Sequence, residues 1–214
     1  MKKLKLGMVG GGQGAFIGGV HRIAARLDGK WDLVAGALSS NPERAALSAA
    51  ELGIAPDRSY ASYDEMAKAE ASRADGIDAV AIVTPNHLHA GPAVAFLNAG
   101  IHVICDKPLA ATQDQALAIK AAADVSSAKF ILTHNYTGYP MIRQAREMVA
   151  PGDHGKIREI QSEYAQDWLT EYAKNKQADC CTETNVSGAG AIGDFGTLAF
   201  YLLSLVWGLQ SLAL

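Results

Sequence analysis

Short apolar runs alternate with longer amphipathic segments along the first part of the chain. The runs cover residues 4–9, 32–38, 78–83, 101–105 and 129–133 and are apolar nearly throughout. Such runs are typical of strands buried on both faces of a parallel sheet. The segments between them begin with helix signals, such as Ser62 followed by Glu65 and Thr112 followed by Gln115. The alternation predicts an α/β fold with a doubly wound Rossmann domain over residues 1–134.

The pattern changes near residue 135, which predicts a second, partial α+β domain over residues 135–214. Residues 155–168 alternate between polar and apolar side chains, as a strand with one exposed face does. Residues 195–214 carry no charge and approach the ~20 residues that can span a bilayer. Because Gly196, Ser204 and Gln210 interrupt this stretch, we expect a buried helix, with a membrane anchor as the alternative.

Composition and charge restrict the partners of the chain. Its 214 residues are 49% hydrophobic and carry a net charge of -3, so we expect a soluble globular protein and no nucleic-acid partner. The three cysteines form no disulfide framework, and the N-terminus has no signal-peptide core. We therefore predict a cytoplasmic protein with no membrane partner.

A glycine-rich turn at residues 7–22 follows the first predicted strand and opens the first predicted helix. This is the context in which a dinucleotide-binding fingerprint occurs. Gly10 provides the tight turn and Gly12 lets the backbone approach a pyrophosphate. The third position is Ala15 in a strict reading, or Gly18 if the turn has an insertion. The turn predicts nucleotide binding; the alternative is a flexible loop with no ligand.

The residues after the second predicted strand bear on the choice between NAD and NADP. Proteins that prefer NAD have an acid there, which hydrogen-bonds the ribose 2'-hydroxyl. Here Ser39, Ser40 and Arg44 offer hydroxyls and a cation. We therefore expect NAD(P) as the cofactor, with a preference for NADP. The alternative is that these residues only cap and solvate a helix.

Polar turns follow the later strands, at the sheet edge where ligands bind in this fold class. The turn at residues 84–89 could hold the nicotinamide ribose, and its two histidines lack the further ligands that a metal site needs, so no metal is predicted. Lys107 follows the fourth strand, where its ammonium can reach a substrate oxygen; the alternative is a solvated surface lysine. The predicted cofactor-binding residues are Gly10, Gly12, Gln13, Ala15, Phe16, Ile17, Ser39, Ser40, Arg44, Thr84, Pro85, Asn86, His89, Lys107 and Asn135.

The combination of motifs resembles the glucose-fructose oxidoreductase, inositol dehydrogenase and MocA family of nicotinamide-dependent oxidoreductases. The similarity rests on the glycine turn, on residues 84–110, on "GDHGKIREI" at 152–160 and on "GAGAIGDFGT" at 188–197. The resemblance implies that Lys107 and Asp194 are catalytic, that Asp106 helps to hold the cofactor region, and that the second domain binds substrate. It further implies hydride transfer between nicotinamide and a hydroxyl-bearing carbon of a sugar or cyclitol, by a homo-oligomer.

Two departures from the family pattern favour a second hypothesis. The motif similar to Asp-x-Gly-x-His ends here in Leu198, which cannot accept a proton, so His134, Tyr136 and Lys107 are the remaining candidates. Family members also continue with strands that complete the second domain. A natural short form, a damaged gene and a missing C-terminal portion are all compatible with this. The alternative function is a non-catalytic dinucleotide-binding or interaction protein.

Overall fold

The computed structural model describes residues 2–152, 155–167, 169–171, 178, 190 and 192–208. The chain divides into two compact units, Met1–Leu132 and Thr133–Leu214. This division lies close to the change of sequence pattern at residue 134. The role of the second unit as a substrate domain stays a prediction.

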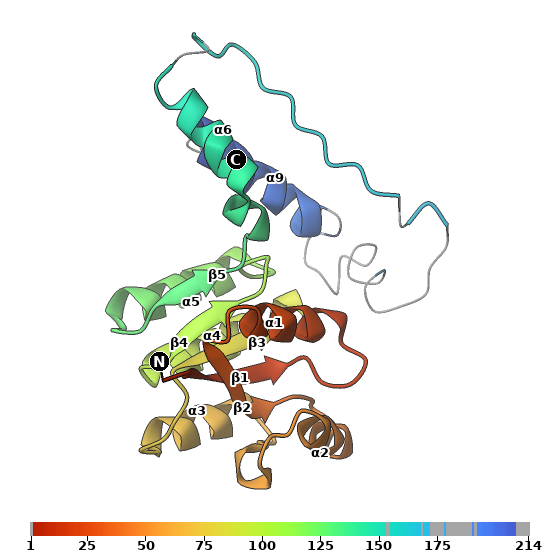
Figure 1. Ribbon diagram of the computed structural model, residues 1–214, viewed down its shortest axis with the longest axis vertical. Coiled ribbons are helices and arrows are strands. Elements are labelled where there is room, and N and C mark those ends of the chain that lie inside the picture. Colours follow the sequence, from red (N-terminus) through yellow and green to blue (C-terminus); the bar gives the residue numbers. More distant parts are fainter. Residues whose placement is uncertain are drawn as a thin grey trace. The chain divides into compact units, whose positions relative to one another are not determined.

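The first unit is built on a five-stranded parallel sheet in the order β2, β1, β3, β4, β5 (Figure 1). The strands are β1 (Leu4–Gly10), β2 (Trp31–Ala37), β3 (Ala79–Val83), β4 (His102–Cys105) and β5 (Phe130–Leu132). Each of the five apolar runs forms one of these strands, so the predicted Rossmann sheet is confirmed. A single parallel bridge joins Gly36 to Ser59 outside β2. With this bridge counted as a short strand, the order is the 3-2-1-4-5-6 order of the Rossmann fold.

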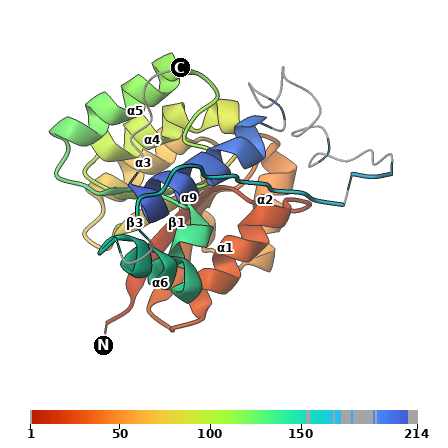
Figure 2. The ribbon, with the colours of Figure 1, turned by 90° about the horizontal axis from the view of Figure 1, so that it is seen from above.

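Helices cover both faces of the sheet (Figure 2). They are α1 (Phe16–Arg26), α2 (Pro42–Glu51), α3 (Tyr63–Ser72), α4 (Ala90–Asn98) and α5 (Gln113–Val125), with short turns η1 (Pro56–Arg58) and η2 (Asn86–Leu88). The predicted caps form, since the Ser62 side chain accepts a hydrogen bond from the Glu65 amide and the Thr112 side chain accepts one from the Gln115 amide.

The buried residues of β3 alternate between two hydrophobic cores, one on each face of the sheet. Val80 and Ile82 pack with residues of α3, α4 and α5, such as the fully buried Phe96. Ala81 and Val83 pack with residues of α1 and α2 on the other face. A strand buried on both faces has no polar positions, which is why β3 reads as a continuous apolar run.

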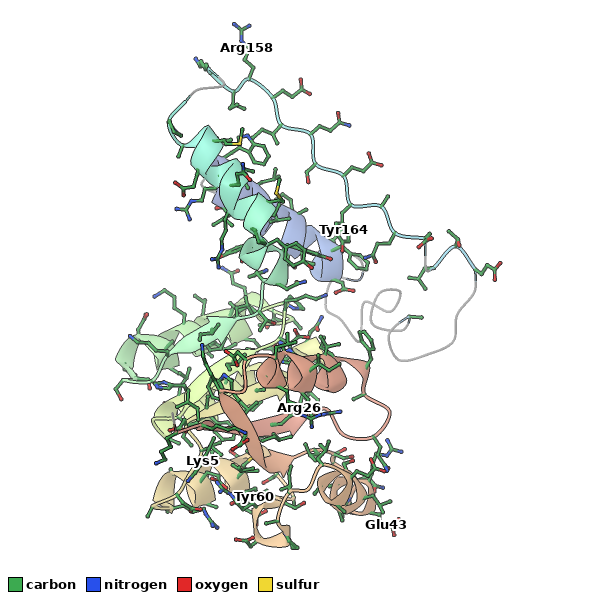
Figure 3. The ribbon with its side chains drawn as sticks, viewed as in Figure 1. Lys5, Arg26, Glu43, Tyr60, Arg158 and Tyr164 are labelled. Carbon is green, nitrogen blue, oxygen red and sulfur yellow. The ribbon has the colours of Figure 1, made fainter. Side chains whose placement is uncertain are left out.

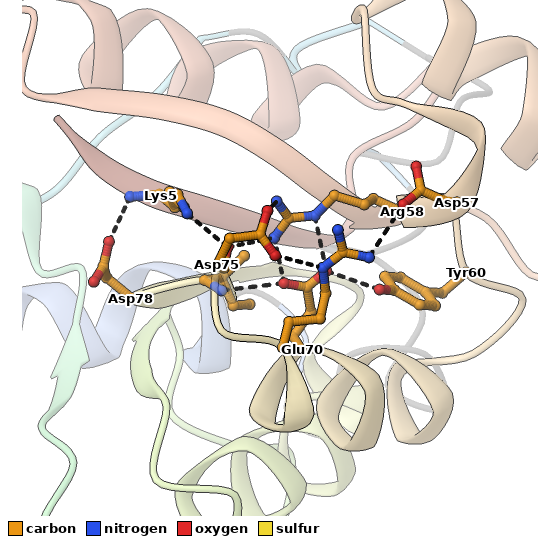
Figure 4. Close-up of polar contacts among 9 residues, drawn as sticks. Lys5, Asp57, Arg58, Tyr60, Glu70, Asp75 and Asp78 are labelled. Carbon is orange, nitrogen blue, oxygen red and sulfur yellow. Dashed lines mark hydrogen bonds and ion pairs between the residues drawn. The ribbon is translucent and has the colours of Figure 1, made fainter.

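A buried ionic network joins η1 and α3 to the amino ends of the strands (Figure 4). The Glu70 carboxylate accepts hydrogen bonds from Arg58 Nε at 3.0 Å, from the Tyr60 hydroxyl at 2.8 Å and from the Ile77 amide at 3.1 Å. Burial and the hydrogen bond to Glu70 raise the pKa of Tyr60 to about 12. Because Ile77 precedes β3, the network lies at the opposite end of the strands from the glycine turn, which follows β1. We assign it a stabilising role.

The second unit contains η3 (Asn135–Gly138), α6 (Pro140–Val149), the π-helical turn η4 (Ile192–Gly196) and α9 (Thr197–Trp207). Helices α6 and α9 pack against each other. Within α9, Leu198 and Val206 are buried, whereas Phe200 and Tyr201 are exposed, so the expected buried helix is only partly buried. No helix in the described part of the chain is long and apolar enough to cross a membrane.

The strand predicted over residues 155–168 is wrong for the residues that the structure describes, because residues 155–167 adopt no regular secondary structure. A strand is stable only when its backbone N–H and C=O groups pair with a neighbouring strand. No other strand is present among the described residues of the second unit. The alternation of polar and apolar residues is therefore not sufficient to form one here.

Candidate functional site

The glycine turn, residues 10–14, is packed against its neighbours so closely at Gly10, Gly11 and Gly12 that a side chain would clash there. Gly10 ends β1 with a φ of +79°, a conformation that favours glycine. A Cβ on Gly12 would lie 2.7 Å from Ser48 Oγ and 2.8 Å from the Leu38 carbonyl oxygen. Both positions therefore require glycine for backbone conformation or packing within the protein, and their contact with a pyrophosphate stays a prediction.

Gly18 packs as closely against the turn as the third glycine of such a fingerprint does. A Cβ at this position would lie 2.4 Å from Gly11 Cα and 2.7 Å from the Gly11 carbonyl oxygen, so only glycine lets α1 pack on the turn. Ala15 instead lies at the N-cap of α1 and makes no side-chain capping bond there. The first turn of α1 has no acidic residue. Its free amides and positive dipole end fit a pyrophosphate.

Two residues that support the turn were missed by sequence reasoning. Ser48 of α2 is 2% exposed; its Oγ accepts a hydrogen bond from the Gln13 amide at 3.0 Å and donates one to the Arg44 carbonyl at 2.6 Å. Arg22 of α1 donates to the Gly11 carbonyl at 2.7 Å. Ser48 could have been suspected, because it is a polar residue on the alanine-rich buried face of α2.

Three turns meet at the carboxyl edge of the sheet. A Cβ on Gly10 would lie 3.0 Å from Thr84 Cγ2, which puts the glycine turn beside the turn at residues 84–89. The Asp106 amide donates to the Ile82 carbonyl at 2.9 Å, which continues the β3–β4 pairing into Asp106, Lys107 and Pro108. We call these three residues the lysine turn. The three turns follow the adjacent strands β1, β3 and β4, where ligands bind in this fold.

His89 connects the lysine turn to the turn at residues 84–89. It is completely buried, with Nδ1 2.8 Å from the Pro108 carbonyl oxygen and Nε2 2.9 Å from the Thr84 carbonyl oxygen. The peptide bond between Lys107 and Pro108 is cis, and Lys107 is half-buried. The ring contacts of His89 are thus with backbone carbonyls, while its predicted contact with a cofactor stays a prediction.

The structure brings most of the predicted cofactor-binding residues together in the first unit. Of these, the exposed residues are Gln13, Phe16, Ser40, Arg44 and Pro85. The half-buried residues are Gly10, Ala15, Ile17, Ser39, Thr84, Asp106 and Lys107. The buried residues are Gly12, Asn86 and His89. Asn135 and Asp194 belong to the second unit.

The residues after β2 present both signs of charge to solvent. Asn41 caps α2 by accepting a hydrogen bond from the Arg44 amide at 2.9 Å, and the side chain of Arg44 is exposed. Glu43, in the first turn of α2, is also exposed (Figure 3). The carboxylate of Glu43 therefore lies close in sequence to Arg44, and the sequence argument for NADP did not consider it.

Cys105, at the end of β4, lies directly before the lysine turn as a free, buried thiol. Burial, with a smaller contribution from the charge of Asp106, raises the pKa of Cys105 to about 12. The thiol is protonated at neutral pH and is not a nucleophile. Among the described residues, no group of three His, Cys, Asp or Glu side chains is arranged to hold a metal ion.

In the second unit, aromatic side chains surround the turn that carries Asp194. Tyr164 stacks on Phe195 beside the start of α9, and its hydroxyl forms a hydrogen bond with the Tyr136 hydroxyl (Figure 3). That hydrogen bond and burial, with a smaller effect of Asp194, raise the pKa of Tyr136 to about 12. Tyr136 therefore stays protonated at neutral pH and can donate a hydrogen bond but cannot act as a base.

The remaining proton-acceptor candidate of this unit is His134. Its ring stacks on Tyr201 with centroids 4.1 Å apart. Leu198 is 4% exposed in α9, so the position that resembles the family histidine is a buried apolar one. Asp194 lies in a π-helical turn, a feature that is frequent at functional sites.

Comparison with known proteins adds to this geometry. Residues 4–134 match the Gfo/Idh/MocA oxidoreductase family with an NAD-binding Rossmann fold. The uncharacterized oxidoreductase YfiI of Bacillus subtilis is 35% identical over 210 residues, which cover 96% of this chain and 53% of that protein. Levoglucosan dehydrogenase of Pseudarthrobacter phenanthrenivorans is 31% identical over 204 residues, which cover 92% of this chain and 49% of that protein.

Solved structures give the same result. An inositol dehydrogenase homolog complexed with NAD+ from Azotobacter vinelandii matches with a TM-score of 0.89 and 34% identity, over 97% of this chain and 54% of that one. An oxidoreductase from Sinorhizobium meliloti matches with a TM-score of 0.85 and 54% identity, over 98% of this chain and 54% of that one. The chain thus spans about half the length of these relatives.

Proposed function

The chain belongs to the Gfo/Idh/MocA family of oxidoreductases, and from this membership we propose that it catalyses NAD(P)-dependent hydride transfer to or from a hydroxyl- or carbonyl-bearing carbon of a sugar or cyclitol. The observation that carries the proposal is the meeting of the glycine turn and the lysine turn at one edge of the sheet. Relatives named for levoglucosan and for myo-inositol with NADH support the substrate class. Because the chain spans about half of these relatives, its activity is part of the proposal.

The dinucleotide would be held by the first unit. Gly10, Gly12 and the amino end of α1 would hold the pyrophosphate, because backbone amides and a positive dipole end are there and side chains are excluded. A bound nicotinamide dinucleotide supplies the group that accepts or donates the hydride. Thr84, Pro85 and Asn86 would contact the nicotinamide ribose from the turn after β3.

The preference for NADP is a finer proposal, supported by Arg44 and by similarity to a D-xylose 1-dehydrogenase (NADP(+)) of Haloferax volcanii, 33% identical over 132 residues. Arg44→Gln should weaken NADPH binding by about 10-fold, because a charge-assisted contact is lost, and leave NADH binding within about 2-fold. Glu43→Gln is the matched control and should not weaken NADPH binding. Equal loss of both dinucleotides in Arg44→Gln would refute the preference.

Lys107 would hold the substrate oxygen by donating a hydrogen bond from Nζ and would help to move its proton, with Asp194 as the second catalytic residue. Purified protein is tested by absorbance at 340 nm with both dinucleotides across sugars, inositols and their ketones. We expect activity that Lys107→Met lowers by at least about 100-fold, the lower range of general acid and base catalysis. A complete absence of turnover in the full screen would refute the enzymatic proposal.

The buried Leu198 favours a second candidate, a dinucleotide-binding protein without catalysis. Leu198→His discriminates between the two. If dinucleotide binds the unmodified protein without turnover and the variant gains turnover, the site is intact and only the proton acceptor is lacking. Without turnover in either, the non-catalytic function is favoured.

A reducing, cytoplasmic location and a homo-oligomer also stay proposals, the first supported by the free thiol of Cys105.

A further inference from the structure

We propose that His21 is a positioning residue, which ties the lysine turn to the helix that carries the glycine turn. The inference rests on the proposed function, because it assigns to His21 a role in placing Lys107. His21 is a residue of α1 and is not among the predicted cofactor-binding residues.

His21 lies at the middle of α1 and reaches across to the end of β4. Its Nε2 is 3.4 Å from Asp106 Oδ1, between residues 85 positions apart in the sequence. The two side chains are 12% and 15% exposed. Because water has little access to either group, it competes less with this contact than with one on the surface. The contact links α1 to the residue directly before Lys107.

The same helix is also fixed to the glycine turn. Arg22, the next residue, donates to the Gly11 carbonyl at 2.7 Å. Gly18, one turn earlier, packs on Gly11 with no space for a Cβ. Consecutive side chains of one helix thus contact the turn predicted to hold the pyrophosphate and the turn predicted to hold the substrate oxygen. We infer that α1 sets the distance between them.

The backbone on both sides of Lys107 has its own supports. The Asp106 amide pairs with Ile82 and the Pro108 carbonyl contacts His89 Nδ1 at 2.8 Å. These contacts do not involve His21. We therefore expect removal of the imidazole to leave the turn folded and to change the position of Lys107 by removing the contact between α1 and Asp106.

The test follows Lys107 by NMR in protein whose lysine amines carry 13C-methyl groups. The Lys107 signal is identified because it is absent from the spectrum of Lys107→Arg. In the unmodified protein, saturating NADH or NADPH should shift this signal. His21→Leu should reduce that shift at least about 3-fold, while the dissociation constant of the dinucleotide changes by less than about 3-fold. His21→Gln should restore the shift, because its amide nitrogen takes the place of imidazole Nε2. His102→Leu, an exposed histidine of β4, is the control.

Asp106→Ala provides a second route that leaves α1 unchanged, and its effect on the Lys107 signal should equal that of His21→Leu without adding to it in the double variant. With a substrate in hand, kcat should fall about 10-fold and KM should stay within about 3-fold. A Lys107 signal that responds equally in His21→Leu, Asp106→Ala and the unmodified protein would overturn the positioning role. A signal that never responds, although the dinucleotide binds, would overturn the proposed function instead.

Discussion

Adjacent glycines of α1 provide a matched pair of substitutions at the glycine turn. A Cβ on Gly18 would lie 2.4 Å from Gly11 Cα, whereas a Cβ on Gly19 would have only the end of the Arg22 side chain within reach, at 3.9 Å. Both positions are helical, and both gain up to about 1 kcal/mol of helix propensity when glycine becomes alanine. The pair therefore differs only in the space available to the added methyl group.

The structure sets the size of the effect in Gly18→Ala. Carbon atoms approach to roughly 3.5–4.0 Å, so α1 must move away from the glycine turn by about 1 Å or more. Backbone atoms cannot turn aside as a flexible side chain does, and such overpacking costs about 1–3 kcal/mol. Gly18→Ala should be about 1–2 kcal/mol less stable than the parent, and Gly19→Ala up to about 1 kcal/mol more stable.

The assay is urea unfolding followed by Trp31 of β2, in a background of Trp168→Phe and Trp207→Phe, so that the signal reports the first unit alone. Titration with NADH and NADPH accompanies it. We expect at least about 10-fold weaker binding in Gly18→Ala, because the turn and the amino end of α1 separate, and less than about 2-fold change in Gly19→Ala. Equal stability and equal affinity in the two variants would refute the assignment of Gly18 as the third glycine.

Three further predictions concern buried groups. Glu70→Gln should cost about 3 kcal/mol in the same unfolding assay, because Arg58 loses its buried carboxylate partner and keeps the exposed carboxylate of Asp75 at 3.5 Å; a loss below about 1 kcal/mol would contradict the buried ion pair. The folded-state pKa of Tyr60 is raised to about 12, above its usual value near 10, so its contribution to stability is present below about pH 10 and is lost as the pH rises toward 12. Tyr60→Phe should remove this part of the pH dependence, and identical slopes in the two proteins would count against it. Cys105, made the single thiol by replacing the other two cysteines with serine, should react with Ellman's reagent at pH 8 only on unfolding; rapid reaction of the folded protein would show that it is not buried.

The sheet could be predicted from sequence because its central strands are largely buried on both faces. In residues 79–83, burial on both faces leaves no position for a polar side chain, so the strand is a continuous apolar run. Such a run is not expected in a loop. The strand expected at 155–168 failed for a related reason, since alternation describes one exposed face but does not supply the neighbouring strand that pairs with it. Pairing partners are distant in sequence, and the pattern of one segment carries no information about them.

The site was predictable where a backbone requirement leaves a mark on the sequence. Glycine at positions 10 and 12 is such a mark, whereas the choice between Ala15 and Gly18 required the distance to Gly11. His21 and Ser48 act through contacts with residues 85 and 35 positions away, which no local pattern reveals. A spacing argument was still available for His21, because it lies three residues after Gly18 and so on the same face of α1.

The central claim is that the lysine turn faces the nicotinamide of a dinucleotide held by the glycine turn. A crystal structure at saturating NADH or NADPH tests it most directly, through the distance from Lys107 Nζ to nicotinamide C4. We predict about 6 Å, which leaves room for one substrate carbon and its oxygen between them. A distance beyond about 10 Å, or a crevice without dinucleotide at saturation, would contradict the account.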